Sequence, residues 1–243
     1  MRHAAWQTIS PAIPRTCQLI QTEHQRRAYL RALGIDVWVP SEQLEPDLAP
    51  VVETEDVGGM SWPALRSSVA ACTRCPLHAS RTQTVFGVGN ENADWLIVGE
   101  APGAEEDRRG EPFVGRAGQL LTEMLRAAGQ EREQVFIANI LKCRPPHNRD
   151  PEAEEAAACR HYLERQIALV EPKMILAVGR IAAQQLLKTD TAVSKLRGKL
   201  HRVGEIPVVV TYHPAYLLRS PTQKRKAWQD LCLAMDVAAG RAA

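Results

Sequence analysis

Four cysteines are spaced in a pattern that suits a metal centre. Cys72 and Cys75 form a CxxC pair, and fifteen residues separate Cys143 from Cys159. Sets of four thiolates bind either zinc or an iron-sulfur cluster, and the spacing is compatible with both. The alternative for Cys159 is a place in the core, because it shares a helical face with apolar residues.

Three further stretches combine stiff and polar residues: "GEAPG" from residue 99, "NILKCRPPHNRDP" from residue 139 and "HPAYLLR" from residue 213. Glycine allows the backbone to approach a ligand closely, and proline stiffens the wall of a loop. Taken alone, each stretch is also typical of an ordinary turn between a strand and a helix. Three of them at the ends of apolar runs predict a preformed pocket.

The apolar runs around these stretches are typical of buried strands. They cover residues 94–100, 134–140, 173–179 and 206–213, and helical patterns separate them. This alternation predicts an α/β fold, a three-layer sandwich with a central four-stranded parallel sheet flanked by helices. The carboxyl ends of parallel strands share one rim of the sheet, so the polar stretches are expected to meet there.

Composition and net charge limit which domain organisation and which classes of function are expected. The 243 residues carry a formal net charge of +2, so any contact with nucleic acid depends on local clusters of basic residues. Residues 1–60 are expected to form an N-terminal extension with an acidic linker, and residues 61–243 the principal domain. No apolar run is long enough to span a membrane and no signal peptide is recognised. A cytoplasmic protein is expected, whose cysteines are free or metal-bound.

Five motifs follow one another along the principal domain: "CTRCPLH", "VFGVGN", "LIVGEAPGAEEDRRGEPFVGRAGQLL", "NILKCRPPHNRDP" and "HPAYLLR". Over residues 62–236, these motifs and the cysteine spacing resemble the family 4 uracil-DNA glycosylases, the iron-sulfur members of their superfamily. The resemblance implies a monofunctional DNA repair enzyme that flips uracil out of DNA and hydrolyses its N-glycosidic bond, leaving an abasic site. It also implies a [4Fe-4S] cluster bound by Cys72, Cys75, Cys143 and Cys159.

The resemblance assigns three residues to recognition of the flipped base. Phe113 corresponds to the aromatic platform on which uracil stacks; a core phenylalanine is the alternative. Asn139 corresponds to the amide that reads the polar edge of the base, since an amide offers both a donor and an acceptor. Glu106 corresponds to the residue that crowds the C5 edge and excludes the methyl group of thymine. Its neighbours Glu105 and Asp107 are expected to be solvated.

The resemblance also implies how the bond is broken. His213 corresponds to the histidine that hydrogen-bonds a uracil carbonyl as negative charge develops there, and its protonation state is left open. Ala101 stands where the better-known "GQDPY" enzymes carry an aspartate, so no general base is expected at that position. Asn148 is expected to position the attacking water. Glu100 is expected to contribute through its backbone and local field, and Glu100 and Ala101 to contact the substrate.

Apolar and basic residues near the last motif are expected to hold the DNA. Leu217 resembles the wedge that enters the base stack, with Arg219 beside it for a phosphate group. In "SKLRGKLHR", Lys195, Arg197 and Lys199 surround a glycine and are expected to contact the DNA backbone. A solvated charged face is the alternative for this stretch.

The N-terminal segment "RRAYLRALGIDVWVP", residues 26–40, resembles the clamp-loader-binding start of the psi subunit of bacterial DNA polymerase III. This resemblance suggests a docking peptide that brings the enzyme to the replication machinery. The alternative is a helix that packs on the enzyme's own surface through Leu30, Leu33 and Trp38. The enzyme itself is expected to be a monomer associated with the nucleoid.

Two other functions are compatible with the same motifs. One is a noncatalytic iron-sulfur module that binds DNA or a polymerase, and the other is a glycosylase with broader specificity for deaminated bases such as hypoxanthine. The presence of Phe113, Asn139, Asn148 and His213 together favours the enzyme, because a binding module has no need of a uracil pocket.

Overall fold

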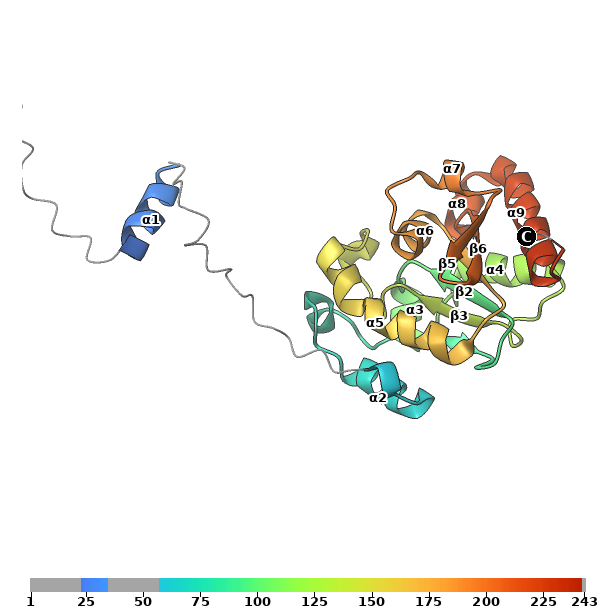
Figure 1. Ribbon diagram of the computed structural model, residues 1–243, viewed down its shortest axis with the longest axis horizontal. Helices are drawn as coiled ribbons and strands as arrows, with labels where there is room; N and C mark the ends of the chain where they lie inside the picture. Colours follow the sequence, from blue (N-terminus) through green and yellow to red (C-terminus); the bar gives the residue numbers. More distant parts are fainter. Residues whose placement is uncertain (1–22, 35–56, 242–243) are drawn as a thin grey trace, which may run out of the picture. The chain divides into compact units, whose positions relative to one another are not determined.

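The computed structural model describes residues 23–34 and 57–241. The chain divides into two units, Met1–Glu53 and Thr54–Ala243. In the first unit the structure describes helix α1 (Glu23–Ala32), drawn in blue in Figure 1. Trp38 and most of the predicted acidic linker lie outside the described residues. The second unit contains the sheet and all of the predicted site residues.

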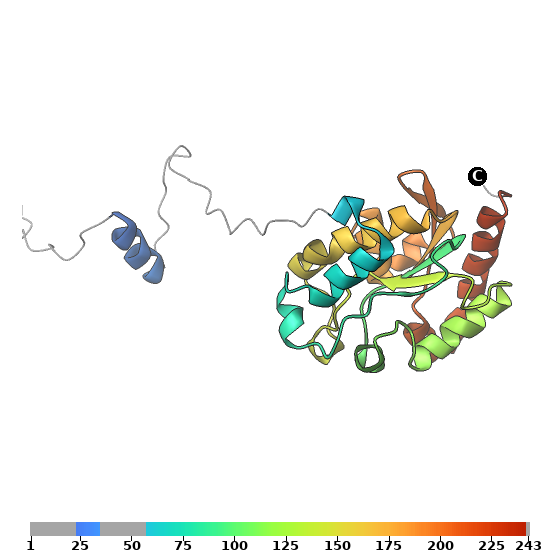
Figure 2. The ribbon, with the colours of Figure 1, turned by 90° about the horizontal axis from the view of Figure 1, so that it is seen from below.

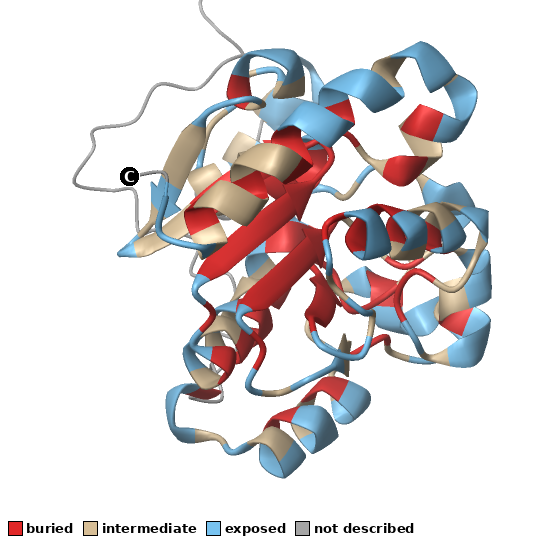
Figure 3. Ribbon diagram, turned by 90° about the vertical axis from the view of Figure 1, so that its right-hand side faces the viewer, coloured by how far each residue is buried: buried red, intermediate tan, exposed pale blue. Residues whose placement is uncertain are grey.

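Four parallel strands form the centre of the second unit. They are β2 (Trp95–Gly99), β3 (Phe136–Asn139), β4 (Met174–Val178) and β6 (Ile206–Thr211). Their spatial order is β3-β2-β4-β6, with all neighbours parallel. Nearly all of their residues are buried, as the red strands in Figure 3 show, which explains their continuous apolar runs. These are the four strands predicted from the sequence, and the α/β fold class is confirmed.

Two short antiparallel strands extend the predicted four-stranded sheet to six. β1 (Val88–Gly89) pairs with β3, and β5 (Leu200–Val203) pairs with β6. No sequence pattern predicts them, because β1 has only two residues and β5 mixes polar with apolar side chains at the edge of the sheet. The stretch "SKLRGKLHR" therefore contributes an edge strand as well as a loop.

Each face of the sheet is covered by its own helices, because side chains of a strand alternate between the two faces. One face carries α2 (Trp62–Ala71), α5 (Ala153–Val170) and α6 (Arg180–Leu187). The other face carries α4 (Arg116–Ala127), α8 (Pro214–Arg219) and α9 (Lys224–Ala238). Figure 2 shows the sheet between these layers, which confirms the three-layer sandwich.

Short elements complete the unit at the ends of the strands. They are α3 (Ala104–Arg109), α7 (Val193–Leu196), and the 3-10 helices η2 (Val57–Gly59), η3 (Pro76–Ala79), η4 (Pro146–Asn148) and η5 (Pro221–Gln223). None of the helices in the described ranges is long and apolar enough to cross a membrane.

A buried ion pair ties α9 to the segment before β5. The Asp230 carboxylate is fully buried and accepts from Arg197 Nε at 3.0 Å and Nη2 at 2.9 Å, and from Thr211 Oγ1 at 3.0 Å. Arg197 also donates to the carbonyl oxygen of Lys226 at 2.6 Å. The predicted contact of Arg197 with the DNA backbone is corrected here, because its guanidinium group is engaged inside the fold.

We expect Asp230→Ala to lower the free energy of unfolding by about 3–5 kcal/mol, because it leaves the Arg197 charge without its partner. Asp236 lies on the same helix and pairs with Arg241 at an exposed site. Asp236→Ala is the matched control and is expected to cost no more than about 1 kcal/mol. Urea denaturation of both variants checks the difference. Equal losses would show that the buried pair contributes no more than a surface pair.

Candidate active site

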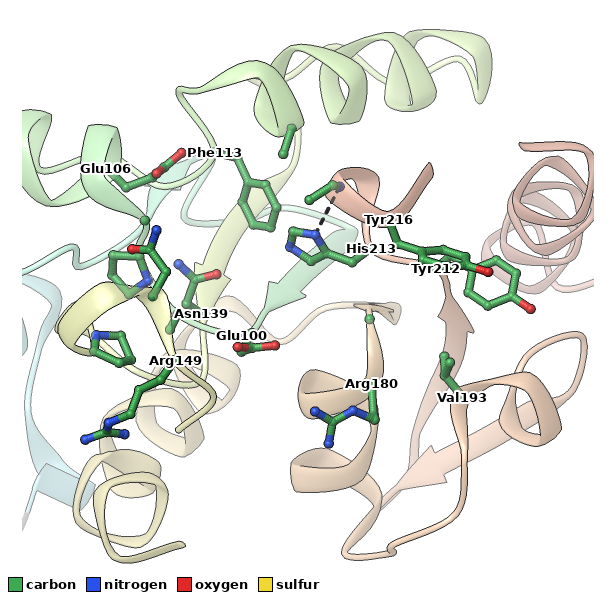
Figure 4. Close-up of a pocket in the computed structure, with 18 of the residues that line it drawn as sticks. Glu100, Glu106, Phe113, Asn139, Arg149, Arg180, Val193, Tyr212, His213 and Tyr216 are labelled. Atoms are coloured by element: carbon green, nitrogen blue, oxygen red, sulfur yellow. Dashed lines mark hydrogen bonds between the residues drawn. The ribbon is translucent and has the colours of Figure 1, made fainter. Parts of the chain in front are cut away.

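A cavity of about 760 Å³ opens at the carboxyl ends of the parallel strands. Its walls come from the loops after β2, β3, β4 and β6, the place where ligands bind in sheets of this type. Figure 4 shows side chains from these loops around one common space. The polar stretches therefore meet as predicted. The predicted residues that line the cavity are Glu100, Ala101, Glu106, Phe113, Asn139, Asn148, His213 and Arg219.

The Phe113 ring lies in the cavity beside the imidazole of His213. The ring centroids are 5.7 Å apart, with 31° between the planes. Phe113 has a φ of +55°, a left-handed conformation that is uncommon for an aromatic residue. Two glycines make room for it: a Cβ at Gly118 would lie 1.7 Å from the Phe113 carbonyl oxygen, and one at Gly99 would lie 2.5 Å from its Cζ. The conformation of Phe113 therefore requires glycine at both of these positions.

The Glu106 carboxylate holds the loop that follows Phe113. Its Oε1 accepts hydrogen bonds from the backbone N–H groups of Val114 at 3.0 Å and Gly115 at 3.1 Å. The sequence suggests that Glu106 lies at the C5 edge of the flipped base. Support of this loop is a second role. A carboxylate fixed by two N–H groups also presents a rigid wall to the cavity.

Asp107, expected from the sequence to be solvated, is only 4% exposed. Both of its carboxylate oxygens accept from the backbone N–H of Thr82, at 2.9 and 3.1 Å. The expectation is wrong because one face of α3 turns toward the loop at Thr82. Glu105 lies on the exposed face of the same helix, as expected.

Asn139 ends β3 with its side chain 2% exposed. Its Oδ1 is buried and has no hydrogen-bond partner among the residues that the structure describes. A Cβ at Gly99 would lie 2.4 Å from this oxygen, so the strand beside it needs a glycine at that point. A buried acceptor without a partner is destabilising. Oδ1 therefore marks the place where a donor group of a ligand is expected.

His213 is a neutral imidazole with a fixed tautomer. Burial, together with the charge of Arg219, lowers its pKa to about 4. Nδ1 accepts a hydrogen bond from the backbone N–H of Ala215 at 3.2 Å, drawn as a dashed line in Figure 4. The ring proton is therefore on Nε2, which is left to act as a donor. The structure thus assigns the protonation state that the sequence leaves open.

Glu100 brings a titratable carboxyl group into the cavity. Burial raises its pKa to about 7, the charge of Asp150 acts in the same direction, and Arg180 opposes both. Asp150 and Arg180 form an ion pair at the rim, with an N–O distance of 2.5 Å. Asn148 is exposed, and its Oδ1 accepts from Arg144 Nε at 2.8 Å. The sequence suggests a role for Glu100 through its backbone and local field, whereas the raised pKa of its carboxyl follows from burial and leaves no local sequence signal.

Of two adjacent leucines on α8, the one that the sequence predicts to face the DNA is buried. Leu217 is 1% exposed and packs in the core, so its predicted role as a DNA wedge is corrected. Leu218 is 38% exposed. Neighbouring helical residues point about 100° apart, and a helix this short has no periodic pattern that shows which one faces outward. Arg219, Lys195 and Lys199 are all exposed.

A second, small cavity is lined by all four predicted metal ligands: Cys72, Cys75, Cys143 and Cys159. The Sγ of Cys143 accepts from Arg81 Nη1 at 3.0 Å, and the Sγ of Cys159 accepts from the backbone N–H of Lys142 at 3.3 Å. Burial raises the pKa of the Cys159 thiol to about 12. Within the described ranges, no three His, Cys, Asp or Glu side chains are grouped to hold a metal ion. Four sulfurs around one cavity, two of them with N–H donors, nevertheless fit a thiolate-ligated centre.

Comparison with known proteins agrees with this geometry. The model of the Uracil DNA glycosylase superfamily matches residues 86–232. A type-4 uracil-DNA glycosylase of Archaeoglobus fulgidus is 45% identical over 170 residues, 67% of this chain and 85% of that protein. One of Thermotoga maritima is 49% identical over 154 residues, 63% of this chain and 80% of that protein. A type-5 uracil-DNA glycosylase of Pyrobaculum aerophilum is 31% identical over 180 residues, 60% of this chain and 79% of that protein.

The chain therefore belongs to the uracil DNA glycosylase superfamily, and it is similar to the type-4 members. It is a DNA repair hydrolase that excises uracil from DNA. The resemblance seen in the five motifs is confirmed. The enzyme is favoured over the noncatalytic module, since both the family and the cavity point to excision.

We expect Gly99→Ala to lower kcat/KM for uracil excision by about 100-fold, because the added methyl group displaces both Phe113 and Asn139. The fold is expected to persist, since the contacts are with side chains. Gly59→Ala is the control, because no atom lies within 4 Å of a Cβ there. Single-turnover excision assays and circular dichroism compare the two. A Gly99→Ala enzyme with wild-type activity would contradict the packing described for the cavity.

Proposed function

We propose that the cavity binds a flipped uracil between Phe113, Asn139 and His213. The observation that carries the proposal is the buried, unpaired Oδ1 of Asn139 beside the Phe113 ring. Uracil has an N–H donor between two carbonyl acceptors, so the amide can accept from the N–H group and donate to one carbonyl. Cytosine reverses this pattern and leaves Oδ1 unpaired. Glu106, held rigidly at the wall, leaves no room for the methyl group of thymine.

His213 stabilises the charge that cleavage leaves on the base. As the N-glycosidic bond breaks, its electrons move onto the uracil ring and its carbonyl oxygens. The neutral Nε2–H group of His213 donates a hydrogen bond to one of these oxygens, and the Ala215 N–H holds the ring in that orientation. A fixed dipole in a buried site stabilises such charge without reorganising. Ala101 also lines the cavity.

Glu100 and Asn148 position the water that attacks the sugar. The sugar becomes cationic as the bond breaks, so a weak nucleophile is sufficient. Above about pH 7 the Glu100 carboxyl is ionised and can accept a proton from this water. The Asn148 amide, anchored through Arg144, supplies a second hydrogen bond to the water. The Glu100 side chain thus gains a direct role, in addition to the backbone and field effects expected from the sequence.

The four cysteines hold a [4Fe-4S] cluster. This proposal is supported by the four sulfurs around one cavity and by the similarity to the type-4 enzymes. The Arg81 guanidinium and the Lys142 N–H donate to two of the sulfurs. Such donors would stabilise the negative charge on the ligands of a cluster. When bound, the cluster would cross-link α2, α5 and the loop after β3, and excision itself needs no electron transfer.

Exposed residues beside the cavity hold the DNA. Leu218 is the exposed apolar side chain at this place and would enter the base stack where the uracil leaves it. Arg219 lines the cavity, and the exposed Lys195 on α7 and Lys199 just before β5 would contact phosphate groups. The described residues of one chain line this cavity, and we infer that a monomer acts on chromosomal DNA in the nucleoid.

The N-terminal unit docks the enzyme to the clamp loader. This proposal is supported by the resemblance of residues 26–40 to the start of the psi subunit and by the separate unit that contains α1. Tyr29 on α1 is 62% exposed, and Leu33, directly after the helix, is 74% exposed. Apolar residues that contact a partner protein would be exposed in this way. Trp38, the third apolar residue of interest, lies outside the described residues.

We expect the excision rate of the wild-type enzyme to rise as the pH increases through about 7. The pKa of Glu100 is raised, so its carboxyl is protonated below this value and ionised above it. His213, with a pKa of about 4, stays neutral across this range. Glu100→Gln is expected to be about 100-fold slower and to lose the pH step. The assay is alkaline cleavage of an end-labelled oligonucleotide that contains one uracil.

Matched oligonucleotides with thymine or hypoxanthine test specificity in the same assay. Glu105→Gln is the control variant, because this neighbouring carboxylate lies on the exposed face of α3. A pH step that persists in Glu100→Gln would assign it to another group. Cleavage at hypoxanthine as fast as at uracil would favour the broader specificity, and no cleavage at uracil would refute the proposed pocket.

Deleting residues 1–53 is expected to leave uracil excision unchanged and to abolish binding to the purified clamp-loader complex. Surface plasmon resonance measures this binding, with the full-length chain as the reference. A truncated enzyme that binds the complex as tightly as the full chain would refute the docking role. A truncated enzyme with a lower Tm would favour the alternative, in which the segment packs on the enzyme itself.

A further inference from the structure

Lys142 is a buried cation with no part in the proposed excision steps. It is 1% exposed and follows the end of β3 by three residues. Its Nζ donates to the carbonyl oxygen of Asn139 at 2.8 Å and to Gln166 Oε1 at 2.6 Å. Gln166 is itself fully buried and donates to the carbonyl oxygen of Phe86 at 2.9 Å. The ammonium group is therefore held in one position by neutral acceptors.

The charge of Lys142 needs a negative partner, because a buried cation without one is strongly unfavourable. Among the described residues, its ammonium group forms no ion pair with a carboxylate. Lys142 does line the cysteine cavity, where it precedes Cys143 and donates its backbone N–H to Cys159 Sγ. Four thiolates carry a net negative charge around either an iron-sulfur cluster or zinc. Cys143 and Cys159 are direct neighbours of Lys142, along the chain and through its backbone N–H, and as thiolates they would supply this negative charge.

Helix α5 holds Lys142 at both ends. Cys159 on this helix accepts from its backbone, and Gln166, two turns further along, accepts from its side chain. The same ammonium group then reaches back to the main chain of Asn139, whose side chain enters the uracil cavity. A continuous chain of contacts thus runs from the cysteine centre to the base-reading residue.

We propose that Lys142 is a positioning residue, whose ammonium group is the counter-ion of the four-cysteine centre and fixes the main chain of Asn139 for base recognition. The inference rests on the proposed roles of Asn139 and of the cysteines. It explains why a lysine is buried between the two cavities. It also gives the metal centre an influence on uracil binding that requires no electron transfer.

Lys142→Met tests the proposal in the full-length holoenzyme, because methionine has a similar length without the charge and the donors. Lys173→Met is the matched control, because Lys173 is an exposed lysine that pairs with Asp94 and lines neither cavity. Iron content, the reduction potential of the cluster, excision rate and inhibition by free uracil are measured for both. Only the loss of the Lys142 cation is expected to shift the potential to more negative values, since the reduced cluster then loses a stabilising charge.

Only Lys142→Met is expected to slow excision and weaken inhibition by free uracil, each by roughly tenfold. Wild-type excision and uracil inhibition in Lys142→Met would overturn the proposal, and so would equal losses in Lys173→Met. If Lys142→Met does not fold, Lys142→Gln keeps a donor without the charge, and an unchanged potential and excision rate in that variant would overturn the proposal. An active wild-type enzyme that purifies with neither iron nor zinc would instead refute the metal centre, and with it the counter-ion.

Discussion

The parallel ladder between β2 and β3 continues past the ends of both strands, and both centres of the protein depend on it. The N–H groups of Ile140 and Leu141 donate to the carbonyl oxygens of Gly99 and Glu100, each at 3.0 Å. These bonds hold two exit loops side by side, so that Glu100 and Asn139 enter the same cavity. The next residues along the chain reach the cysteine cavity. The residue proposed to read the base and the wall of the cysteine cavity are therefore held by one short stretch of backbone.

The groups proposed to contact the base carry no net charge, whereas ion pairs lie at the rim of the cavity. Arg180 pairs with Asp150, and Arg149 pairs with the buried Glu155 at 2.6 Å. The groups proposed to contact the base are an amide, an aromatic ring and a neutral imidazole. In a site of low dielectric constant, fixed dipoles interact more strongly with developing charge than they do in water. The neutral state of His213 fits this arrangement, because its Nε2–H group needs no net charge to act.

The central strands and the convergence of the loops could be predicted from the sequence, because apolar runs mark buried strands and parallel topology brings their ends together. The roles of the site residues came from the family resemblance. Side-chain orientation could not be predicted in the same way. Leu217 and Leu218 are chemically identical, and only packing decides which is buried. Arg197 and Asp107 look like surface charges, since Asp230 and Thr82 lie far away along the chain.

Two buried polar side chains near the end of β3 differ in whether the fold supplies their hydrogen-bond partners. The Lys142 ammonium has its acceptors within the fold, whereas Asn139 Oδ1 has none among the described residues. An unpaired buried acceptor costs the free enzyme about 1–3 kcal/mol. A base with an N–H group at that point offsets the cost on binding, and a base with an acceptor there does not. In the proposed pocket, discrimination between uracil and cytosine therefore rests on one hydrogen-bond acceptor that has no partner among the described residues.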